Sequence, residues 1–403
     1  MFLYRTGLFA RTYRSFLIVP LYTIFASLGG SSIKKVGKSL MQRICHVSPI
    51  SIHSTRWIEA FQKKGYKVSL ITDVQTWLAQ KPRNVPIYVI PTLVIYNVHR
   101  RLIPNYISIT KILKQIKPDL VHLHMQHHYA PAVYLSRMPY ILHSWGLEVL
   151  ELHQMSISRR VLAKQVAMKA HKIIVDAKCM KQIWKNTGIS ENKVEVIPFG
   201  VDTNLFNPNT NGNQIRKKLR IQKKDITIIS TRPFFNHYNI DCLVKAIPMI
   251  IRKHENVVFI IKGRGPLEGN IRKLAKKLRV DQHIRFTYPV PYHILPQYLA
   301  TANIYVSTSF IDSTSVSLLE AMACGLPAVV TDISGNREWI QNGKNGLLFP
   351  PRNSKALAEK IMRLIENEDL RKQFGERCFQ EIEKRATWEK CVSKMEAVYE
   401  SLI

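Results

Sequence analysis

Acidic residues are scarce in this chain of 403 residues. It carries 28 Asp and Glu against 59 Lys and Arg, which gives a formal net charge of +31. No acid precedes Glu59, and none lies between Asp73 and Asp119, so the first half is the more one-sided. Such a balance predicts an anionic partner, namely nucleic acid, an acidic membrane surface or a phosphorylated substrate. A solvated basic surface without a specific partner is the alternative.

Paired cysteines and long apolar runs are also lacking. The six cysteines are scattered without a Cys-x-x-Cys pair, which suits a reducing cytosol and gives no sign of a zinc or disulfide framework. The apolar run from Phe16 to Leu28 is broken by Pro20 and is shorter than the roughly 20 residues of a spanning helix.

Residues 1–40 therefore pose a separate question. Basic residues flank the apolar run on both sides, Arg5, Arg11 and Arg14 before it and Lys34, Lys35 and Lys38 after it. This pattern predicts an interfacial membrane anchor or an uncleaved signal-like segment. The alternative is a translation start at Met41, immediately before the first predicted strand.

From Met41 onward, short β-rich segments alternate with helical patterns. The expected strands lie in RICHV, KVSLIT, VPIYVIP, LVHLH, YILHSW, KIIVDA and VEVIPFG, and then in ITIIST, VVFIIKG, IRFTYP, IYVSTS, AVVTDI and GLLF. Strand–helix alternation indicates βαβ units and parallel sheets. We therefore predict an α/β protein of two doubly wound, Rossmann-like parallel-sheet domains that face each other across a cleft.

The same pattern predicts where the domains begin and end. Residues 202–224 contain an Asn-, Gly- and Pro-rich stretch and are interpreted as a linker. It separates a first domain, 41–201, on the acceptor side from a second domain, 225–376, that binds the donor. Residues 377–403 are predicted to form a C-terminal helix, with Thr387 as a helix cap, that crosses back to the first domain.

One stretch, Ser309–Asp332, combines a strand end, a hydroxyl-rich turn and a helix. Ser313, Thr314 and Ser315 are natural caps for the helix that contains "SLLEAMA". A helix N-terminus offers free N–H groups and a dipole that favour an anion such as a diphosphate. Glu320 lies more than a turn inside, where a carboxylate can accept both hydroxyls of a ribose. Asp312 precedes the helix and can accept sugar hydroxyls, although Asp312 taken by itself is better interpreted as a capping or turn residue.

Residues 300–350 resemble the donor-binding region of the retaining glycosyltransferases of family 4, which have the GT-B fold. The family's acid-x7-acid pattern "ExfGxxxlEAMAcGxPvv" appears here as "DSTSVSLLEAMACGLPAVV". "SGNREWIQNGKNGLLFPPRN" is similar to the family's "GGxxEiixdgxnGxLvxpxd", and "PDLVHLH", "VEVIPFGVDTNLFNP", "STRPFF" and "IIKGRGPLE" resemble its other landmarks in order. The resemblance covers most of residues 41–403 and is most specific in the second domain.

The resemblance implies roles for the residues that match. Glu320 is expected to hold the nucleotide ribose, and Asp312, at the position of the family's first Glu, is expected to contact the donor sugar. Arg232 matches an arginine that neutralises the diphosphate. The full implied donor-binding set is Arg232, Tyr238, Gly263, Gly265, Ser313, Thr314, Ser315, Val316 and Glu320.

Two departures from the family pattern affect this site. The family usually has a lysine five or six positions after the arginine, whereas this chain offers His237 and Tyr238 there. The family's "HGxD", whose His lies near the reacting sugar, reads "HSWGLE" here, with Trp145 at that place and His143 two residues earlier. His143 is therefore a candidate catalytic residue, in addition to Asp312 and Glu320. The alternative is that His143 is a histidine of the core.

The resemblance implies a retaining glycosyltransferase of the hexosyltransferase type. It would move a sugar from a nucleotide-diphosphate sugar to a hydroxyl of a glycan or lipid-linked acceptor. The chain contains no Asp-x-Asp pair, so we predict no metal and no other cofactor. The expected location is cytoplasmic and peripheral, on an anionic membrane surface. A nucleotide-sugar epimerase of the same architecture and a basic nucleic-acid-binding protein are the alternatives; the latter lacks a recognition motif.

Overall fold

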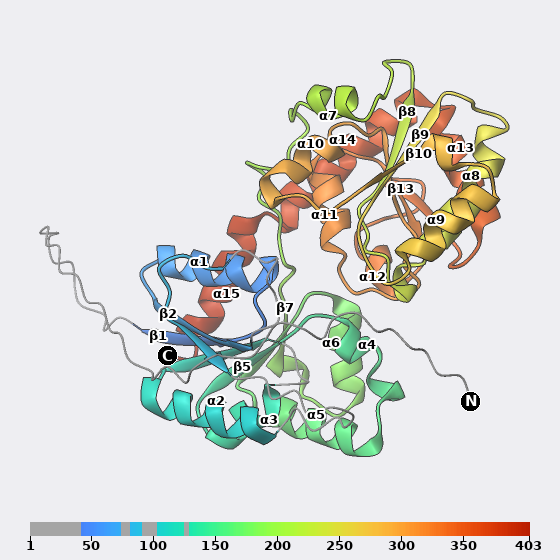
Figure 1. Cartoon of the computed structure of the whole chain (residues 1–403). Helices are drawn as coiled ribbons and strands as arrows, with labels where there is room; N and C mark the ends of the chain where they lie inside the picture. The colour runs from blue at the N-terminus through green and yellow to red at the C-terminus, as the bar shows by residue number, and fades with distance from the viewer. Residues whose placement is uncertain (1–41, 74–80, 91–102, 125–128) are drawn as a thin grey trace, which may run out of the picture. The chain divides into compact units, whose positions relative to one another are not determined.

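The computed structural model describes residues 42–73, 81–90, 103–124 and 129–403 of the chain (Figure 1). The predictions made for residues 1–40 lie outside these ranges. Each strand segment expected from the sequence contains a strand, and every strand pairing among the described residues is parallel. The α/β class and the two parallel-sheet domains are therefore confirmed.

The first sheet has the strand order β3-β2-β1-β4-β5-β6-β7. Its strands are β1 Arg43–Val47, β2 Lys67–Asp73, β3 Ile87–Ile90, β4 Leu120–His124, β5 Tyr140–Ser144, β6 Lys172–Val175 and β7 Val194–Val196. The helices between them are α1 Ile52–Lys63, α2 Ile103–Ile116, α3 Ala130–Ser136, α4 Leu147–Leu150, α5 Ile157–Lys169 and α6 Lys178–Asn186, with short 3-10 turns at Leu152–Gln154 and Glu191–Lys193.

The second sheet has the order β10-β9-β8-β11-β12-β13. Its strands are β8 Ile226–Ser230, β9 Val257–Lys262, β10 Ile284–Thr287, β11 Ile304–Ser307, β12 Ala328–Thr331 and β13 Gly346–Phe349. Its helices are α8 Ile240–Ile251, α9 Glu268–Lys277, α10 Leu295–Leu299, α11 Val316–Ala323, α12 Ser334–Arg337, α13 Ser354–Ile365 and α14 Glu368–Arg385, with 3-10 turns at Asn236–Tyr238, Asp281–His283 and Tyr292–Ile294.

Both sheets are buried on their two faces, as continuous apolar strands require. One face of the first sheet packs against α2, α3, α5 and α6. The opposite face packs against α1 and against α15, Trp388–Glu400, which belongs to the end of the chain. Thr387 caps α15 by accepting a hydrogen bond from the Lys390 backbone N–H. In the second sheet, α8 and α13 cover one face, and α11 and α14 cover the other.

The connection between the two sheets is more structured than the sequence suggested. The stretch interpreted as a linker, 202–224, contains the helix α7, Asn213–Lys218. Residue 377 lies inside α14, so the chain turns toward the first sheet only at Ala386 and Thr387. Strand order reverses between β1 and β4 and between β8 and β11, and ligands of doubly wound sheets bind beyond the carboxyl ends of strands at such points.

Candidate functional site

The family-implied residues meet where the second sheet reverses its strand order. Arg232 follows β8, Gly263 follows β9 and Asp312 follows β11, and these three strands are neighbours in the sheet. All three loops leave the carboxyl ends of parallel strands, so they emerge at one edge. The topology therefore brings together residues that are up to 80 positions apart in the sequence.

The hydroxyl-bearing residues of the turn after β11 make two kinds of contact. Ser315 is the N-cap of α11, and its Oγ accepts a hydrogen bond of 3.3 Å from the Leu318 N–H. Val316 is the first helical residue. Ser313 and Thr314 do not cap the helix; they make hydrogen bonds to Asp176, beyond the end of β6. The prediction that all three are caps holds only for Ser315.

Arg232 is buried and held from several sides. One terminal nitrogen, Nη1, donates to Ser315 Oγ at 2.7 Å and to Ser317 Oγ at 2.8 Å. The other, Nη2, donates to Asp312 Oδ2 at 2.5 Å. The Tyr238 ring lies 4.1 Å from the guanidinium carbon, a cation–π distance. The hydroxyls and the ring thus orient the fork beside the N-terminus of α11.

The charge of Arg232 is secure despite its burial. Burial acts to lower the pKa of the guanidinium, but Asp312 together with Tyr238, Tyr305 and Glu320 outweighs it, so the pKa is raised. Nε has no hydrogen-bond partner among the described residues. An always-charged fork with an unfilled donor is suited to an anion with several oxygens.

Asp312 lies closer to the cation than the sequence suggested. The sequence treated Asp312 as a group facing the sugar and Arg232 as a group facing the diphosphate. In the structure the two form one ion pair, with side-chain exposures of 17% and 7%. Oδ1 of Asp312 also accepts from the backbone N–H of Ser313.

Glu320 occupies a different environment from Asp312. It is buried within α11, and burial raises the pKa of its carboxyl to about 7, against the opposing charge of Arg56. Tyr292 lies beside it, and burial together with this carboxylate raises the pKa of the Tyr292 hydroxyl. Glu320 is thus close to half ionised at neutral pH, whereas Asp312 is directly paired with a guanidinium.

Arg56 is a site residue that the sequence did not reveal. It comes from α1 of the first domain, and its guanidinium carbon lies 4.0 Å from the Trp388 ring and 5.5 Å from the Tyr292 ring. Its Nη1 donates to the Gly200 carbonyl, while its Nη2 has no partner among the described residues. "TRWIEAF" resembles any amphipathic helix, so no local signal marks this arginine.

The two glycines have a packing reason that is visible in the structure. A Cβ on Gly263 would lie 2.6 Å from the Arg232 carbonyl oxygen, and one on Gly265 would lie 2.6 Å from the Phe234 carbonyl oxygen. Neither distance is tolerable, so only glycine lets the β9–α9 loop approach the loop that carries Arg232.

A buried acid that the sequence analysis missed, Asp176, lies beside the Ser313–Ser315 turn. Asp176 Oδ2 accepts from Ser313 Oγ at 2.8 Å, and its backbone carbonyl accepts from Thr314 Oγ1 at 2.6 Å. Burial raises the pKa of Asp176 well above its usual range, helped by the charges of Asp312 and Glu148. Burial likewise raises the pKa of Glu148. An acid directly after a buried strand, in a chain so poor in acids, is the signal that could have identified Asp176.

His143 belongs to a stack of buried histidines on the first sheet. It hydrogen-bonds His122 through Nδ1 at 3.0 Å, and His122 in turn pairs with the Tyr399 hydroxyl of α15. Burial lowers the pKa of His143 to about 3. An imidazole that binds protons so weakly is a poor general base. The core alternative therefore describes His143 better than the catalytic one.

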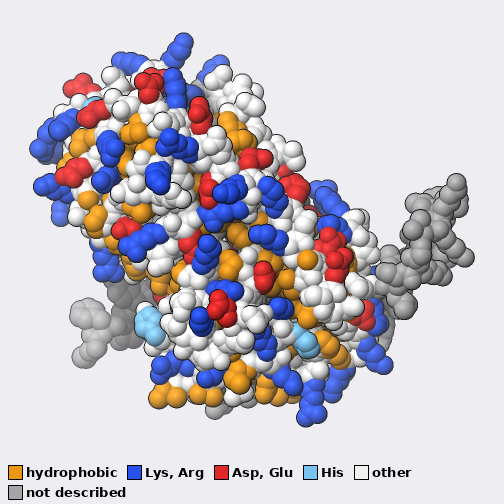
Figure 2. Space-filling view, turned by 180° about the vertical axis from the view of Figure 1, so that it is seen from behind, with side chains coloured by type: hydrophobic (Ala, Val, Ile, Leu, Met, Phe, Trp, Pro, Cys, Tyr) orange, Lys and Arg blue, Asp and Glu red, His pale blue; other side chains and the backbone are white. Residues whose placement is uncertain are grey.

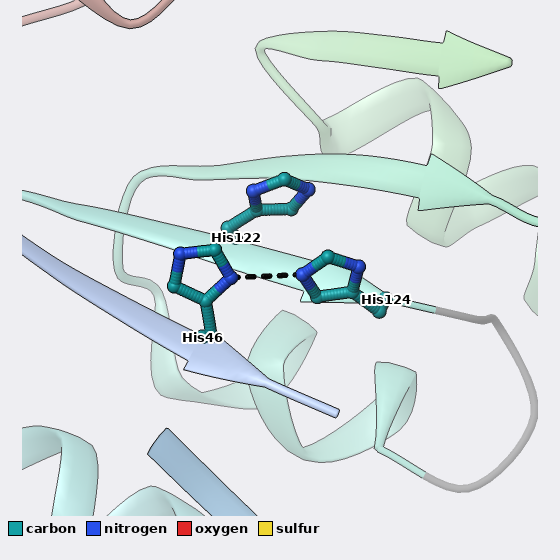
Figure 3. A group of neighbouring side chains, drawn as sticks. All are labelled: His46, His122 and His124. Carbon is teal, nitrogen blue, oxygen red and sulfur yellow. Dashed lines mark hydrogen bonds between the residues drawn. The ribbon is translucent and has the colours of Figure 1, made fainter. Parts of the chain in front are cut away.

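His46, His122 and His124 bring potential metal-ligand atoms within 4.8 Å of one another (Figure 3). A metal lies near the plane of each imidazole that binds it, about 2 Å from the nitrogen. The rings of His122 and His124 are stacked, with centroids 3.9 Å apart and an interplanar angle of 13°. Two nearly parallel ring planes have no nearby point in common at which one metal ion could bind both rings. In addition, Nδ1 of His46 already pairs with Nε2 of His124 at 2.9 Å. The arrangement favours a hydrogen-bonded stack over a ligand set.

Comparison with known proteins identifies the class that this fold and site define. The sequence model for "Glycosyltransferase Family 4" matches residues 50–205, and that for "Glycosyl transferases group 1" matches residues 211–380. The chain therefore belongs to the group 1, family 4 glycosyltransferases, as its motifs predicted.

Individual relatives support this assignment at moderate identity. A GDP-mannose-dependent alpha-(1-6)-phosphatidylinositol monomannoside mannosyltransferase of Mycobacterium tuberculosis is 28% identical over 184 residues, or 44% of this chain. The match spans about half of that relative, 48% of its length. An uncharacterised glycosyltransferase of Methanocaldococcus jannaschii is 28% identical over 79% of this chain and 86% of its own.

Solved structures are similar over nearly the whole chain. Sucrose-phosphate synthase from Thermosynechococcus elongatus gives a TM-score of 0.78 at 18% identity, covering 90% of this chain and 99% of its own. The Anabaena HepE protein in complex with UDP-glucose gives 0.75 at 17% identity, covering 89% and 99%. At such identities the likeness establishes the fold.

Proposed function

We propose that this chain transfers a sugar from a nucleoside-diphosphate sugar to a hydroxyl group of a glycan or lipid-linked acceptor. The observation that carries the proposal is Arg232, fixed beside the N-terminus of α11 with an unfilled Nε donor. A guanidinium and a helix N-terminus both favour a diphosphate. Similar proteins support the same class of donor, since one relative depends on GDP-mannose and one structural neighbour was solved with UDP-glucose.

The residues would act on the charges that develop during transfer. As the glycosyl bond breaks, the leaving diphosphate gains negative charge, and Arg232 with the N-terminus of α11 stabilises it. The sugar carbon becomes cation-like at the same time. Asp312 is hydrogen-bonded to that arginine, so its carboxylate lies where it can accept sugar hydroxyls and offset positive charge. Glu320 would accept the ribose hydroxyls.

Metal independence and retention of configuration form part of the proposal. The chain has no Asp-x-Asp pair, and the Asp312 carboxylate is already paired with Arg232, which supports a metal-free donor site. Retention rests on family membership. The epimerase alternative would need no acceptor, and nothing in the site favours it. The nucleic-acid alternative gives the acids Asp312 and Glu320 no role, and the chain lacks a recognition motif for it.

Steady-state kinetics of Arg232 variants tests the proposal, after a screen of nucleotide sugars for slow donor hydrolysis. Arg232→Ala should lose on the order of 3 kcal/mol of transition-state stabilisation, or about a hundredfold in kcat, because the contact strengthens as charge develops. Arg232→Lys should recover only part of this loss, since an ammonium cannot bridge two oxygens in one plane. A chelator should leave the wild-type rate unchanged.

Arg337→Ala is the matched control, because it removes a guanidinium whose ion pair with Asp332 is at the surface. It should behave as wild type. An Arg232→Ala rate within a few-fold of wild type would contradict the role of the arginine. Strong inhibition by the chelator would contradict metal independence. Sugar conversion without any acceptor would favour the epimerase alternative.

A further inference from the structure

Exposed apolar side chains gather on three helices of the first domain. Ile107 of α2, Leu135 of α3 and Ile157 of α5 are 68%, 60% and 72% exposed. The same helices carry more than half of the large exposed hydrophobic side chains in the described part of the chain, the remaining ones here being Val161, Leu162 and Met168. Helix α3 packs against both α2 and α5, so the six residues belong to one surface, which we call the α2–α3–α5 surface.

The spacing on α5 shows that this exposure is patterned. Ile157, Val161, Lys164 and Met168 recur at intervals of four, three and four, which places them along one side of the helix. Ala163, Val166 and Ala167 are buried on the side toward the sheet. A helix that covers a core needs one apolar stripe, and a second stripe facing outward indicates an interaction surface.

The charge of this surface has a single sign. Helices α2, α3 and α5 contain no acidic residue. Exposed cations on them or directly after them are Lys111, Lys114, Lys117, Arg137, Arg159, Arg160, Lys164 and Lys169. None of these forms an ion pair with a described residue. Figure 2 shows hydrophobic side chains along the lower edge of the molecule with Lys and Arg beside them.

A groove on the same surface joins the two kinds of side chain. Tyr106, Ile107 and Leu135 line its apolar part, and Lys111 and Lys114 line its basic part. On α2, Ile107 lies one turn from Lys111 and two turns from Lys114, so the apolar and the basic group share one face.

We propose that the α2–α3–α5 surface docks on an anionic lipid bilayer, with the apolar stripe in the interface and the cations on the headgroups. This pairing of exposed apolar residues with Lys and Arg is that of proteins that lie on a membrane. A second copy of the chain would place like charges against each other. Nucleic acid would leave the apolar stripe unused. No helix in the described ranges has the length and apolarity to cross a bilayer.

The inference deepens the proposed function and rests on its lipid-linked acceptor. The docking itself does not depend on catalysis. The two ideas are therefore tested by different readouts on the same preparations: co-sedimentation with vesicles reports docking, and protection against thermal unfolding by a nucleoside diphosphate reports the donor site.

The experiment uses the full chain and vesicles of phosphatidylcholine alone or of equal parts phosphatidylcholine and phosphatidylglycerol. Wild type should sediment with the anionic vesicles and detach as salt is added, because the charge term is screened. The apolar variant Ile157→Gln, Val161→Gln, Met168→Gln should reduce partitioning at least about tenfold. The charge variant Arg160→Glu, Lys164→Glu should do the same by reversing two attractions.

The matched control is Lys273→Glu, Lys277→Glu, which reverses two charges at the same i, i+4 spacing on α9 of the other domain. It should bind vesicles as wild type. Equal binding by all variants would overturn the inference and assign docking to another part of the chain, such as residues 1–40. Dimerisation that the apolar variant abolishes, without any effect on vesicles, would overturn it in favour of a second copy. If a nucleoside diphosphate does not protect the wild type against thermal unfolding, the proposed function is contradicted but the docking inference is not.

Discussion

Two carboxylates eight positions apart in the sequence acquire different chemistry from their surroundings. Asp312 forms an ion pair with Arg232, whereas Glu320 is buried in α11, where the charge of Arg56 opposes the effect of burial on its pKa. The sequence analysis assigned both acids to the donor, Glu320 to its ribose and Asp312 to its sugar. Which cation each would meet depends on β8 and α1, which are far away in the chain.

At the residue scale, Glu320→Gln should lose donor affinity and gain stability. The folded pKa of about 7 exceeds the usual value of 4.5, so ionising the buried carboxyl destabilises the fold. This free-energy cost is absent below pH 4.5 and grows as the pH rises toward 7. Between about pH 5 and about pH 8 the stability gain of the variant should increase by about 2 kcal/mol. Wild-type kcat/KM should rise through about pH 7 if the carboxylate binds the ribose, and the variant should lack this rise.

Urea unfolding at several pH values and the pH profile of kcat/KM provide the two measurements. A Glu320→Gln protein that is less stable than wild type at high pH would show that the carboxylate is compensated in the fold. Unchanged donor affinity would separate Glu320 from the nucleotide.

At the scale of elements, α11 depends on Ser315 twice. Its hydroxyl caps the helix and also accepts from Arg232 Nη1. The sequence predicted the cap from the turn composition. It could not predict the second contact, because the arginine lies 83 residues away.

Ser315→Ala should therefore differ from an ordinary cap deletion. It should cost about 1 kcal/mol of stability, the typical value for a lost N-cap, and should also weaken donor binding because Arg232 loses an acceptor. Asn367→Ala removes the cap of α14, where Asn367 accepts from the Leu370 N–H at 2.8 Å, and is the matched control. Thermal unfolding and nucleotide titration separate the two effects. Equal donor affinity in both variants would rule out the second role.

At the scale of the whole molecule, several histidines of the first domain have lowered pKa values. Burial lowers the pKa of His46 and His143 to about 3 and that of His53 to about 4, and it lowers those of His122 and His124 well below their usual range. These groups bind protons in the unfolded chain at pH below about 6.5 but not in the folded one. Their stability contribution is therefore complete above that pH and is lost as pH falls.

The three buried carboxyls Glu148, Asp176 and Glu320 act in the opposite direction. Their pKa values are raised in the fold, so their contribution to the free energy of unfolding increases as the pH falls. The histidines are more numerous, so we expect net loss of stability between about pH 6.5 and about pH 4.5. The difference in the pH dependence of stability between wild type and a histidine variant isolates the contribution of that histidine.

His143→Gln should make the acid side of the stability profile shallower by about one proton, or roughly 1.4 kcal/mol per pH unit. Only the slope is compared, since the substitution also changes packing. His171→Gln, at an exposed position, should leave the slope unchanged. Chemical denaturation across this pH range measures both. A wild-type slope in the His143 variant would mean that the imidazole is already protonated in the fold.

The sequence by itself determined the strands, the α/β class and the caps Ser315 of α11 and Thr387 of α15. Hydrophobic periodicity, turn composition and motif spacing depend only on residues that are close together in the chain, so the sequence alone reveals them. The tertiary structure alone decided that Asp312 pairs with Arg232, that Arg56 faces Glu320 and that His143 joins a buried stack. It also decided that three separate helices share one apolar and basic surface. These facts depend on which strands become neighbours and which helix faces turn outward, and no stretch of sequence contains both partners.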